Sequence, residues 1–256
     1  MWDKHAAGRP MGLTSFHQPY DPSLPSLLMI HGSGGVKALY QPLAAQLKGA
    51  VNPAALDLPG HGDTPAPAPV DDVATYAAFV ADFLAAGPVR PVLLGHSLGG
   101  AVALSVALDH PELLRGIILV GSGSRLRVLP AVLEGLAHNF LATTEMFLKA
   151  SYAPGVDART LELGARMLQD AGAGVVLGDL TACDRFDVSA RLGEIRLPAL
   201  ALAGELDALT PPKYAQFLAS HIPGAREAVI PGAGHMVILE QPGPAASAIL
   251  DFMAIL

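Results

Sequence analysis

One stretch constrains this chain more than any other: residues 91–101, where an apolar run leads into Gly95-x-Ser97-x-Gly99 and then into small residues with helical spacing. This order predicts a strand, a sharp turn with a serine at its apex, and a helix that begins at Leu98. Cβ atoms at Gly95 and Gly99 would collide with the turn and the neighbouring helix, so their absence lets the hydroxyl stand clear. The helix also directs free N–H groups to this point, where an oxyanion can be stabilised. Because so short a pattern also occurs by chance in ordinary glycine-rich turns, the rest of the chain must decide its meaning.

The 256 residues are enough for one large α/β domain or two small ones. Because 51% of them are hydrophobic and only 15% are charged, a sizeable core is expected and disorder is not. A formal net charge of −7 argues against nucleic acid or an anionic membrane as a partner. The single cysteine, Cys183, excludes an intramolecular disulfide and a cysteine metal site, and we interpret it as a small apolar core residue. The N-terminus shows no apolar targeting segment, and no run of about 18 apolar residues predicts a membrane span. A cytoplasmic location is therefore expected.

Short apolar runs alternate with segments of helical periodicity. Strands are predicted at residues 26–30, 51–58, 91–94, 115–121, 199–203 and 227–230. Helices are predicted at residues 39–47, 71–86, 98–109, 214–220 and 244–255. Helical connections between such strands indicate a parallel sheet with helices on both faces. Before residue 26 the chain is rich in glycine and proline, and residues 12–17 give only a weak signal for a short edge strand.

The strand signals disappear between residues 124 and 189, where apolar residues recur every three or four positions. This pattern predicts a helical insertion between two strands of the sheet. An insertion at the carboxyl edge of a parallel sheet would cover a site located there, so we interpret it as a cap. The chain then divides into an α/β core, residues 1–123 and 190–256, and a cap, residues 124–189. The alternative is that these helices only pack on one face of the sheet.

Three side chains with catalytic chemistry follow directly on predicted parallel strands: Ser97, Asp207 and His235. Strands of a parallel sheet end on the same side, so the three loops converge at its carboxyl edge. Their order along the chain is that of the triads found on this kind of sheet. We therefore predict Ser97 as nucleophile, His235 as the base that takes its proton, and Asp207 as the acid that orients the histidine. Glu205 competes with Asp207, but it lies inside the strand end.

The tetrahedral intermediate of acyl transfer needs two N–H donors. The amide of Leu98, at the start of the predicted helix, is the first. The amide of Ser33, in the glycine-rich loop 31–35, is the second, with Gly34 as a less favoured substitute. This loop is not a phosphate loop, because no Gly-Lys-Ser/Thr follows it.

Three more histidines, His31, His61 and His96, lie in the same strand-end loops, so position alone does not select His235. We interpret them as loop-bracing residues, because chain order favours His235 and no acid partner is evident for the others. A metal site made of His31, His61 and His235 is conceivable, but no pairing at ligand spacing supports it. No metal and no cofactor are therefore expected.

Taken together, these segments resemble the α/β-hydrolase fold superfamily. The matching pieces, which span nearly the whole chain, are residues 31–35, 57–62, 95–100, 204–207 and 232–235. The resemblance implies a mostly parallel eight-stranded sheet with helices on both faces and a helical lid inserted after the sixth strand. The chain departs from the family pattern at its N-terminus, where the usual first hairpin is hard to recognise.

The resemblance is less specific for the substrate. Dehalogenases and epoxide hydrolases of the superfamily use an aspartate nucleophile, and Ser97 argues against both. Carbon–carbon bond hydrolases usually have a longer Gly-Pro-Gly loop, from which Val36 and Lys37 depart. The leading hypothesis is a carboxylesterase that cleaves small-molecule esters of small to medium acyl chains through an acyl-enzyme on Ser97. The alternatives are a carbon–carbon hydrolase or lyase with the same triad, or a ligand-binding member of the fold without turnover; the oligomeric state stays open.

Overall fold

The structure, a computed structural model, describes residues 11–256 apart from residues 18 and 67. Seven strands form one sheet in this part of the chain, in the order β1-β3-β2-β4-β5-β6-β7. The neighbouring strands are parallel except for β1 and β3. The strands are β1 (Leu13–Ser15), β2 (Ser26–Ile30), β3 (Asn52–Leu56), β4 (Val92–His96), β5 (Gly116–Val120), β6 (Ala199–Gly204) and β7 (Arg226–Ile230). The predicted α/β class with a mostly parallel sheet is confirmed.

The strand count differs from the eight that the resemblance implies. Seven strands are found in the described residues, and residues 1–10 lie outside them. β1 falls inside the predicted edge strand 12–17 and pairs Leu13 with Leu56 of β3. It is only three residues long because bends follow it at residues 16 and 17.

β2 shows why the strands read as continuous apolar runs. All five of its residues are buried. Leu28 and Ile30 belong to the apolar core on one face of the sheet, and Leu27 and Met29 belong to the core on the other face. Because successive side chains of a strand point to opposite faces, a strand covered on both sides needs apolar residues at every position.

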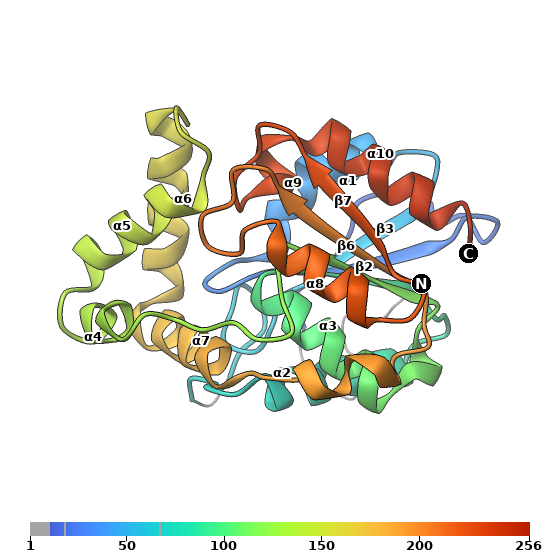
Figure 1. The fold of residues 1–256 in the computed structure, drawn as a ribbon, viewed down its shortest axis with the longest axis horizontal. Helices are drawn as coiled ribbons and strands as arrows, with labels where there is room; N and C mark the ends of the chain where they lie inside the picture. The colour runs from blue at the N-terminus through green and yellow to red at the C-terminus, as the bar shows by residue number, and fades with distance from the viewer. Residues whose placement is uncertain (1–10, 18, 67) are drawn as a thin grey trace.

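Helices cover the two faces of the sheet as predicted (Figure 1). One face carries α2 (Val73–Ala85), α3 (Leu98–Asp109) and α8 (Lys213–His221), and the other carries α1 (Gln41–Gln46), α9 (Val237–Glu240) and α10 (Pro242–Met253). Short 3-10 turns complete the connections at Lys37–Tyr40, Pro111–Leu113 and Ser189–Glu194. α2 begins beside the acidic pair at residues 71–72, where the Asp72 carboxylate accepts the N–H of Thr75 at 2.7 Å and so caps the helix.

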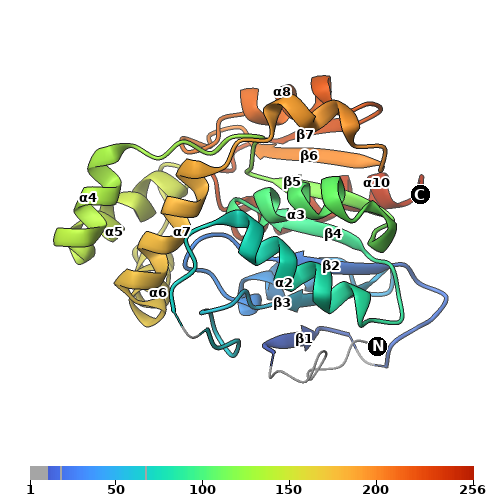
Figure 2. The ribbon, with the colours of Figure 1, turned by 90° about the horizontal axis from the view of Figure 1, so that it is seen from below.

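Between β5 and β6 the chain forms four further helices, α4 (Pro130–His138), α5 (Phe140–Ser151), α6 (Ala158–Ala171) and α7 (Ala173–Arg185). They stand together beside the sheet (Figures 1 and 2) around an apolar cluster of their own. Leu126 and Leu129, which belong to the helically spaced apolar residues of segment 124–189, lie ahead of α4 and outside any helix. The helix begins at Pro130 because a proline ring suits the first turn, where the missing N–H is not needed. No helix of the described residues is long and apolar enough to cross a membrane.

Candidate active site

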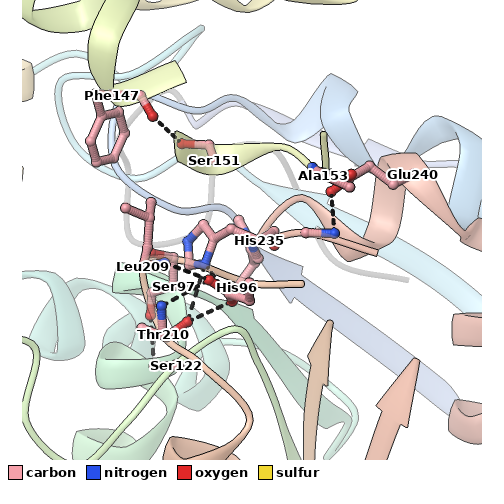
Figure 3. Close-up of polar contacts among 12 residues, drawn as sticks. His96, Ser97, Ser122, Phe147, Ser151, Ala153, Leu209, Thr210, His235 and Glu240 are labelled. Atoms are coloured by element: carbon pink, nitrogen blue, oxygen red, sulfur yellow. Dashed lines mark hydrogen bonds and ion pairs between the residues drawn. The ribbon is translucent and has the colours of Figure 1, made fainter. Parts of the chain in front are cut away.

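Ser97 stands at the turn between β4 and α3 in a strained backbone conformation, with φ 53° and ψ −117°. Among the described residues it alone combines a positive φ with a side chain larger than that of glycine. Such strain typically costs about 1–3 kcal/mol and persists only where the surroundings fix it. Here the N–H of Ser97 donates to Val120 O at 2.9 Å, and Ser122 Oγ donates to Ser97 O at 2.8 Å (Figure 3).

The two glycines of the serine motif are needed for steric reasons. A Cβ on Gly95 would lie 2.0 Å from the carbonyl oxygen of Gly99, and a Cβ on Gly99 would lie 2.3 Å from that of Ile30. The first contact is with the start of the helix, as the sequence predicts. The second is with the end of β2, so Gly99 allows the nucleophile turn to pack against the neighbouring strand.

His235 and Asp207 form a buried pair on the loops that follow β7 and β6. His235 Nδ1 donates to Asp207 Oδ2 at 2.8 Å, and the two residues are only 3% and 4% exposed. The remaining ring nitrogen, Nε2, is therefore the unprotonated one in the neutral ring. Gly204 makes this contact possible, because a Cβ there would lie 2.1 Å from Gly234 O on the histidine loop.

The carboxylate of Asp207 is held as an anion. Burial by itself raises the pKa of this group, but the neighbouring His235 and several hydrogen bonds outweigh it and lower the pKa to about 2. The N–H groups of Leu209 and Thr210 each donate to Oδ1 at 2.8 Å, and the Thr210 hydroxyl donates to Oδ2 at 2.8 Å. Thr210 Oγ1 also lies 3.1 Å from His235 Nδ1, so it touches both members of the pair.

The competing acid, Glu205, is exposed and accepts the N–H of Gly232 at 2.9 Å, away from the histidine ring. A different acid steadies the histidine loop. Glu240 accepts the N–H of Gly234 at 3.0 Å and that of Ala153 at 2.7 Å (Figure 3). It thereby joins the loop before His235 to the segment after α5.

The two predicted oxyanion donors, the N–H groups of Ser33 and Leu98, lie on segments next to Ser97. Leu98 opens α3, and Ser33 follows β2 in the glycine-rich loop. Within the described residues no hydrogen bond engages the N–H of either residue. The substitute donor, Gly34, is already occupied, because its N–H donates to Asp179 Oδ2 at 2.7 Å.

Two cavities meet at Ser97 and His235. The smaller, about 30 Å³, lies between the glycine-rich loop and α5 and α6, and its lining includes Leu148, Met167 and Leu168. The larger, about 210 Å³, is bordered mainly by apolar side chains before and within α4, on α7 and on the acid loop. Phe147 also borders both cavities.

Cys183 lines the larger cavity as well, with its Sγ 3.8 Å from Ser33 Oγ. Burial raises the pKa of the thiol to about 12, so it stays protonated and is unsuited to act as a nucleophile. Its packing within the main apolar cluster agrees with the interpretation of Cys183 as a small core residue.

His31 and His96 brace the loops, as the sequence interpretation holds. His31 Nδ1 donates to Gly32 O at 2.8 Å while its Nε2 accepts the N–H of Leu58 at 3.0 Å. His96 Nε2 donates to His235 O at 3.0 Å. Burial lowers the pKa of both rings to about 3, so both are neutral. No group of three histidine, cysteine or acidic side chains is arranged to hold a metal ion anywhere in the described residues.

His61 differs from the expectation that the other histidines lack an acid partner. Its Nε2 lies 3.0 Å from Oδ2 of Asp179 on α7, and its Nδ1 lies 3.2 Å from Pro59 O. Both neighbours accept hydrogen bonds, so both ring nitrogens must carry protons. Burial lowers the pKa of His61, but the bond to Asp179 outweighs it and raises the pKa above its usual value. In the doubly protonated state, the ring and Asp179 form a buried ion pair.

Asp179 is the residue that sequence reasoning missed. It is fully buried and accepts hydrogen bonds from three segments: Gly34 N at 2.7 Å, His61 Nε2 at 3.0 Å and Tyr76 Oη at 2.5 Å. It therefore ties α7 to the glycine-rich loop, to the loop after β3 and to α2. The sequence signal that could have identified it is a single acid within segment 173–183, whose other residues are apolar or small.

Comparison with known proteins matches residues 27–248 to the model of the alpha/beta hydrolase family. A pimeloyl-[acyl-carrier protein] methyl ester esterase of Neisseria meningitidis serogroup C is 33% identical over 241 residues, covering 88% of this chain and 92% of the relative. The protein of that name from Yersinia enterocolitica is 30% identical, with 88% and 92% covered. Among solved structures, a thermophilic esterase superposes with a TM-score of 0.83 at 34% identity, covering 97% of this chain and 95% of the other. A hydrolase from Pseudomonas aeruginosa PA01, at 23% identity, has a TM-score of 0.85, with 99% and 97% covered, and shows the common fold.

Proposed function

The chain belongs to the alpha/beta hydrolase family, and from this premise we propose that it is a serine esterase with Ser97, His235 and Asp207 as its catalytic triad. The observation that carries the proposal is the buried His235–Asp207 pair, which leaves Nε2 of the ring free at the cavity where the strained Ser97 stands. The N–H groups of Ser33 and Leu98 are the proposed oxyanion donors. The esterase names of the relatives support an ester as the substrate class.

In the proposed mechanism, His235 Nε2 takes the proton of Ser97 Oγ as this oxygen bonds to the ester carbonyl carbon. Negative charge moves to the carbonyl oxygen, and the N–H groups of Ser33 and Leu98 stabilise it. The bond between the carbonyl carbon and the alkoxy oxygen then breaks, and His235 gives its proton to the departing alcohol. His235 then takes a proton from a water molecule, whose oxygen bonds to the acyl carbon. The bond between this carbon and Ser97 Oγ breaks, His235 returns the proton to Oγ, and the carboxylic acid leaves. Asp207, ionised at neutral pH, stabilises the transient imidazolium.

The unequal cavities favour esters of a small alcohol and a medium acyl chain. A space of about 30 Å³ accepts roughly two water-sized groups, which suits a methoxy or ethoxy group. The cavity of about 210 Å³, lined mainly by apolar side chains, suits the acyl chain. Names of relatives that specify a methyl ester support the same division.

We propose further that residues 124–189, which contain α4–α7, act as a cap over a core made of residues 1–123 and 190–256. Side chains of α5, α6 and α7 line the two cavities together with residues from strand-end loops of the core. The cap thus supplies most of the apolar surface that a substrate would contact, while the core supplies the reacting groups.

Hydrolysis of methyl and p-nitrophenyl esters of increasing acyl length tests the proposal. The Ser97→Ala variant should lose about 10⁴–10⁶-fold in kcat. Ser105→Ala, which removes a hydroxyl from the same helix but away from the cavities, is the matched control and should keep its activity. Turnover in Ser97→Ala equal to that of the natural chain would refute the serine mechanism. Absence of turnover by the folded natural chain on every ester would refute the esterase assignment.

A further inference from the structure

The larger cavity beside Ser97 adjoins a wider groove on the surface. The two share Arg127 and Tyr214 in their linings. The groove has a volume of about 620 Å³, and its lining consists of Ser124, Arg125, Arg127, Ser189, Lys213, Tyr214 and Phe217. We call it the basic groove, because three of these residues are cations and none is an acid.

This concentration of positive charge is unusual for the chain, whose formal net charge is −7. Part of it is partnered only loosely. Arg125 Nε lies 3.9 Å from Asp187 Oδ2, and Arg127 Nη1 lies 4.0 Å from Asp184 Oδ1. All four side chains are about a third or more exposed, so these ion pairs contribute little and an incoming anion can compete with them.

Arg127 and Lys213 are placed to meet a ligand. Arg127 Nη1 donates to the backbone carbonyl of Asp184 at 2.6 Å, which fixes one end of the guanidinium and leaves its other N–H groups for a further acceptor. Lys213 opens α8 and takes part in none of the ion pairs found among the described residues. A chain that leaves Ser97 through the larger, mainly apolar cavity can therefore reach Arg127 and the basic groove that adjoins it.

We infer that the basic groove binds an anionic group at the far end of the acyl chain, so that the preferred substrates are short-alkyl esters whose acyl chain ends in a carboxylate or a phosphate. This rests on the proposed function, in which the larger cavity holds the acyl chain. The smaller cavity has no cationic side chain in its lining, so the anion belongs to the acyl end and not to the alcohol end.

The test compares kcat/KM for monomethyl esters of dicarboxylic acids with that for methyl esters of neutral acids of equal chain length. A third series carries a terminal phosphate in place of the carboxylate. One charge-assisted hydrogen bond changes affinity by about 10-fold to 100-fold, so the anionic series should exceed the neutral one by at least about 10-fold at low salt. High salt should reduce this preference. The series with the larger preference identifies the natural anion.

Variants locate the effect. Lys213→Ala and Arg127→Gln should lower kcat/KM for the anionic esters more than for the neutral ones, mainly through KM. The matched control is Arg166→Ala, which removes an exposed cation of α6 that pairs with Glu162 and lines none of these cavities. It should leave the preference unchanged. Equal kcat/KM for anionic and neutral esters, or a preference that survives both groove variants, would overturn the inference. Failure of the chain to cleave neutral methyl esters as well would instead count against the proposed function.

Discussion

Replacement of Asp179 tests how α7 of the proposed cap is coupled to the loop that carries the proposed oxyanion donor Ser33. Its carboxylate is fully buried and accepts hydrogen bonds from Gly34, His61 and Tyr76. Removal of one partner from a buried ion pair costs about 3–5 kcal/mol, and each buried donor left unsatisfied costs about 1–3 kcal/mol. Asp179→Ala should therefore destabilise the protein by on the order of 5–10 kcal/mol, which approaches the whole stability of a typical domain.

A conservative variant separates folding from positioning. Asp179→Asn retains one carbonyl oxygen for the N–H of Gly34, but it loses the charge that faces His61 and the second acceptor oxygen, which receives the Tyr76 hydroxyl. We therefore expect a loss of stability of about 3–5 kcal/mol, which is smaller than that of Asp179→Ala. Because Gly34 follows Ser33 directly, its bond to Asp179 at 2.7 Å orients the proposed Ser33 donor. Full loss of an oxyanion donor lowers kcat by about 10²–10³-fold. Asp179→Asn should show a smaller fall, in kcat more than in KM, because the donor acts on the transition state.

The assays are urea unfolding and ester hydrolysis for both variants. Asp170→Asn, which changes an exposed acid on the adjacent helix α6, is the control and should alter neither measurement. An unchanged unfolding midpoint in Asp179→Ala would refute the stability argument. A destabilised Asp179→Asn with the kcat of the natural chain would leave the stability argument standing and refute the positioning role.

Two further predictions concern the turn and the acid of the proposed triad. Gly95→Ala should abolish activity or folding, since its Cβ would lie 2.0 Å from Gly99 O, whereas Gly193→Ala, whose Cβ would meet no atom within 4 Å, should preserve both soluble yield and esterase rate. The pKa of Asp207 is lowered to about 2 in the folded protein. The ionised carboxylate therefore adds about 2 kcal/mol to the free energy of unfolding above pH 4, and this contribution is lost as the pH falls from about 4 to 2. Urea unfolding between pH 2 and 6 should show this loss of stability in the natural chain and a flatter dependence of stability on pH in Asp207→Asn. The same pH dependence in both proteins would show that Asp207 is not its cause.

The sequence predicted the sheet well because burial on both faces leaves a direct trace in the residues. Residues 26–30 and β2 coincide, since every position of that strand had to be apolar to fill two cores. The serine turn was equally readable, because the two clashes at Gly95 and Gly99 are local and permit only glycine. The periodicity predicted helices within residues 124–189, but it could not show that the first of them would start only at Pro130.

Contacts between distant segments left no such trace. Asp179 is separated from its partner His61 by 118 residues and from Gly34 by 145 residues. Nothing in local periodicity relates these positions. A lone acid in an apolar helix indicates that some buried partner exists, because an isolated buried charge is unfavourable, but only the fold identifies which one.

The choice among four strand-end histidines illustrates the same limit and also how chemistry resolves it. The sequence argument favoured His235 partly because the others seemed to lack an acid, yet His61 has one in Asp179. Possession of a carboxylate partner is therefore not what distinguishes a base. His61 donates from both ring nitrogens, to Asp179 and to Pro59 O, so it has no lone pair with which to take a proton. His235 donates only from Nδ1 and leaves Nε2 open, so the open nitrogen, and not the acid partner, favours His235 over His61 as the proposed base.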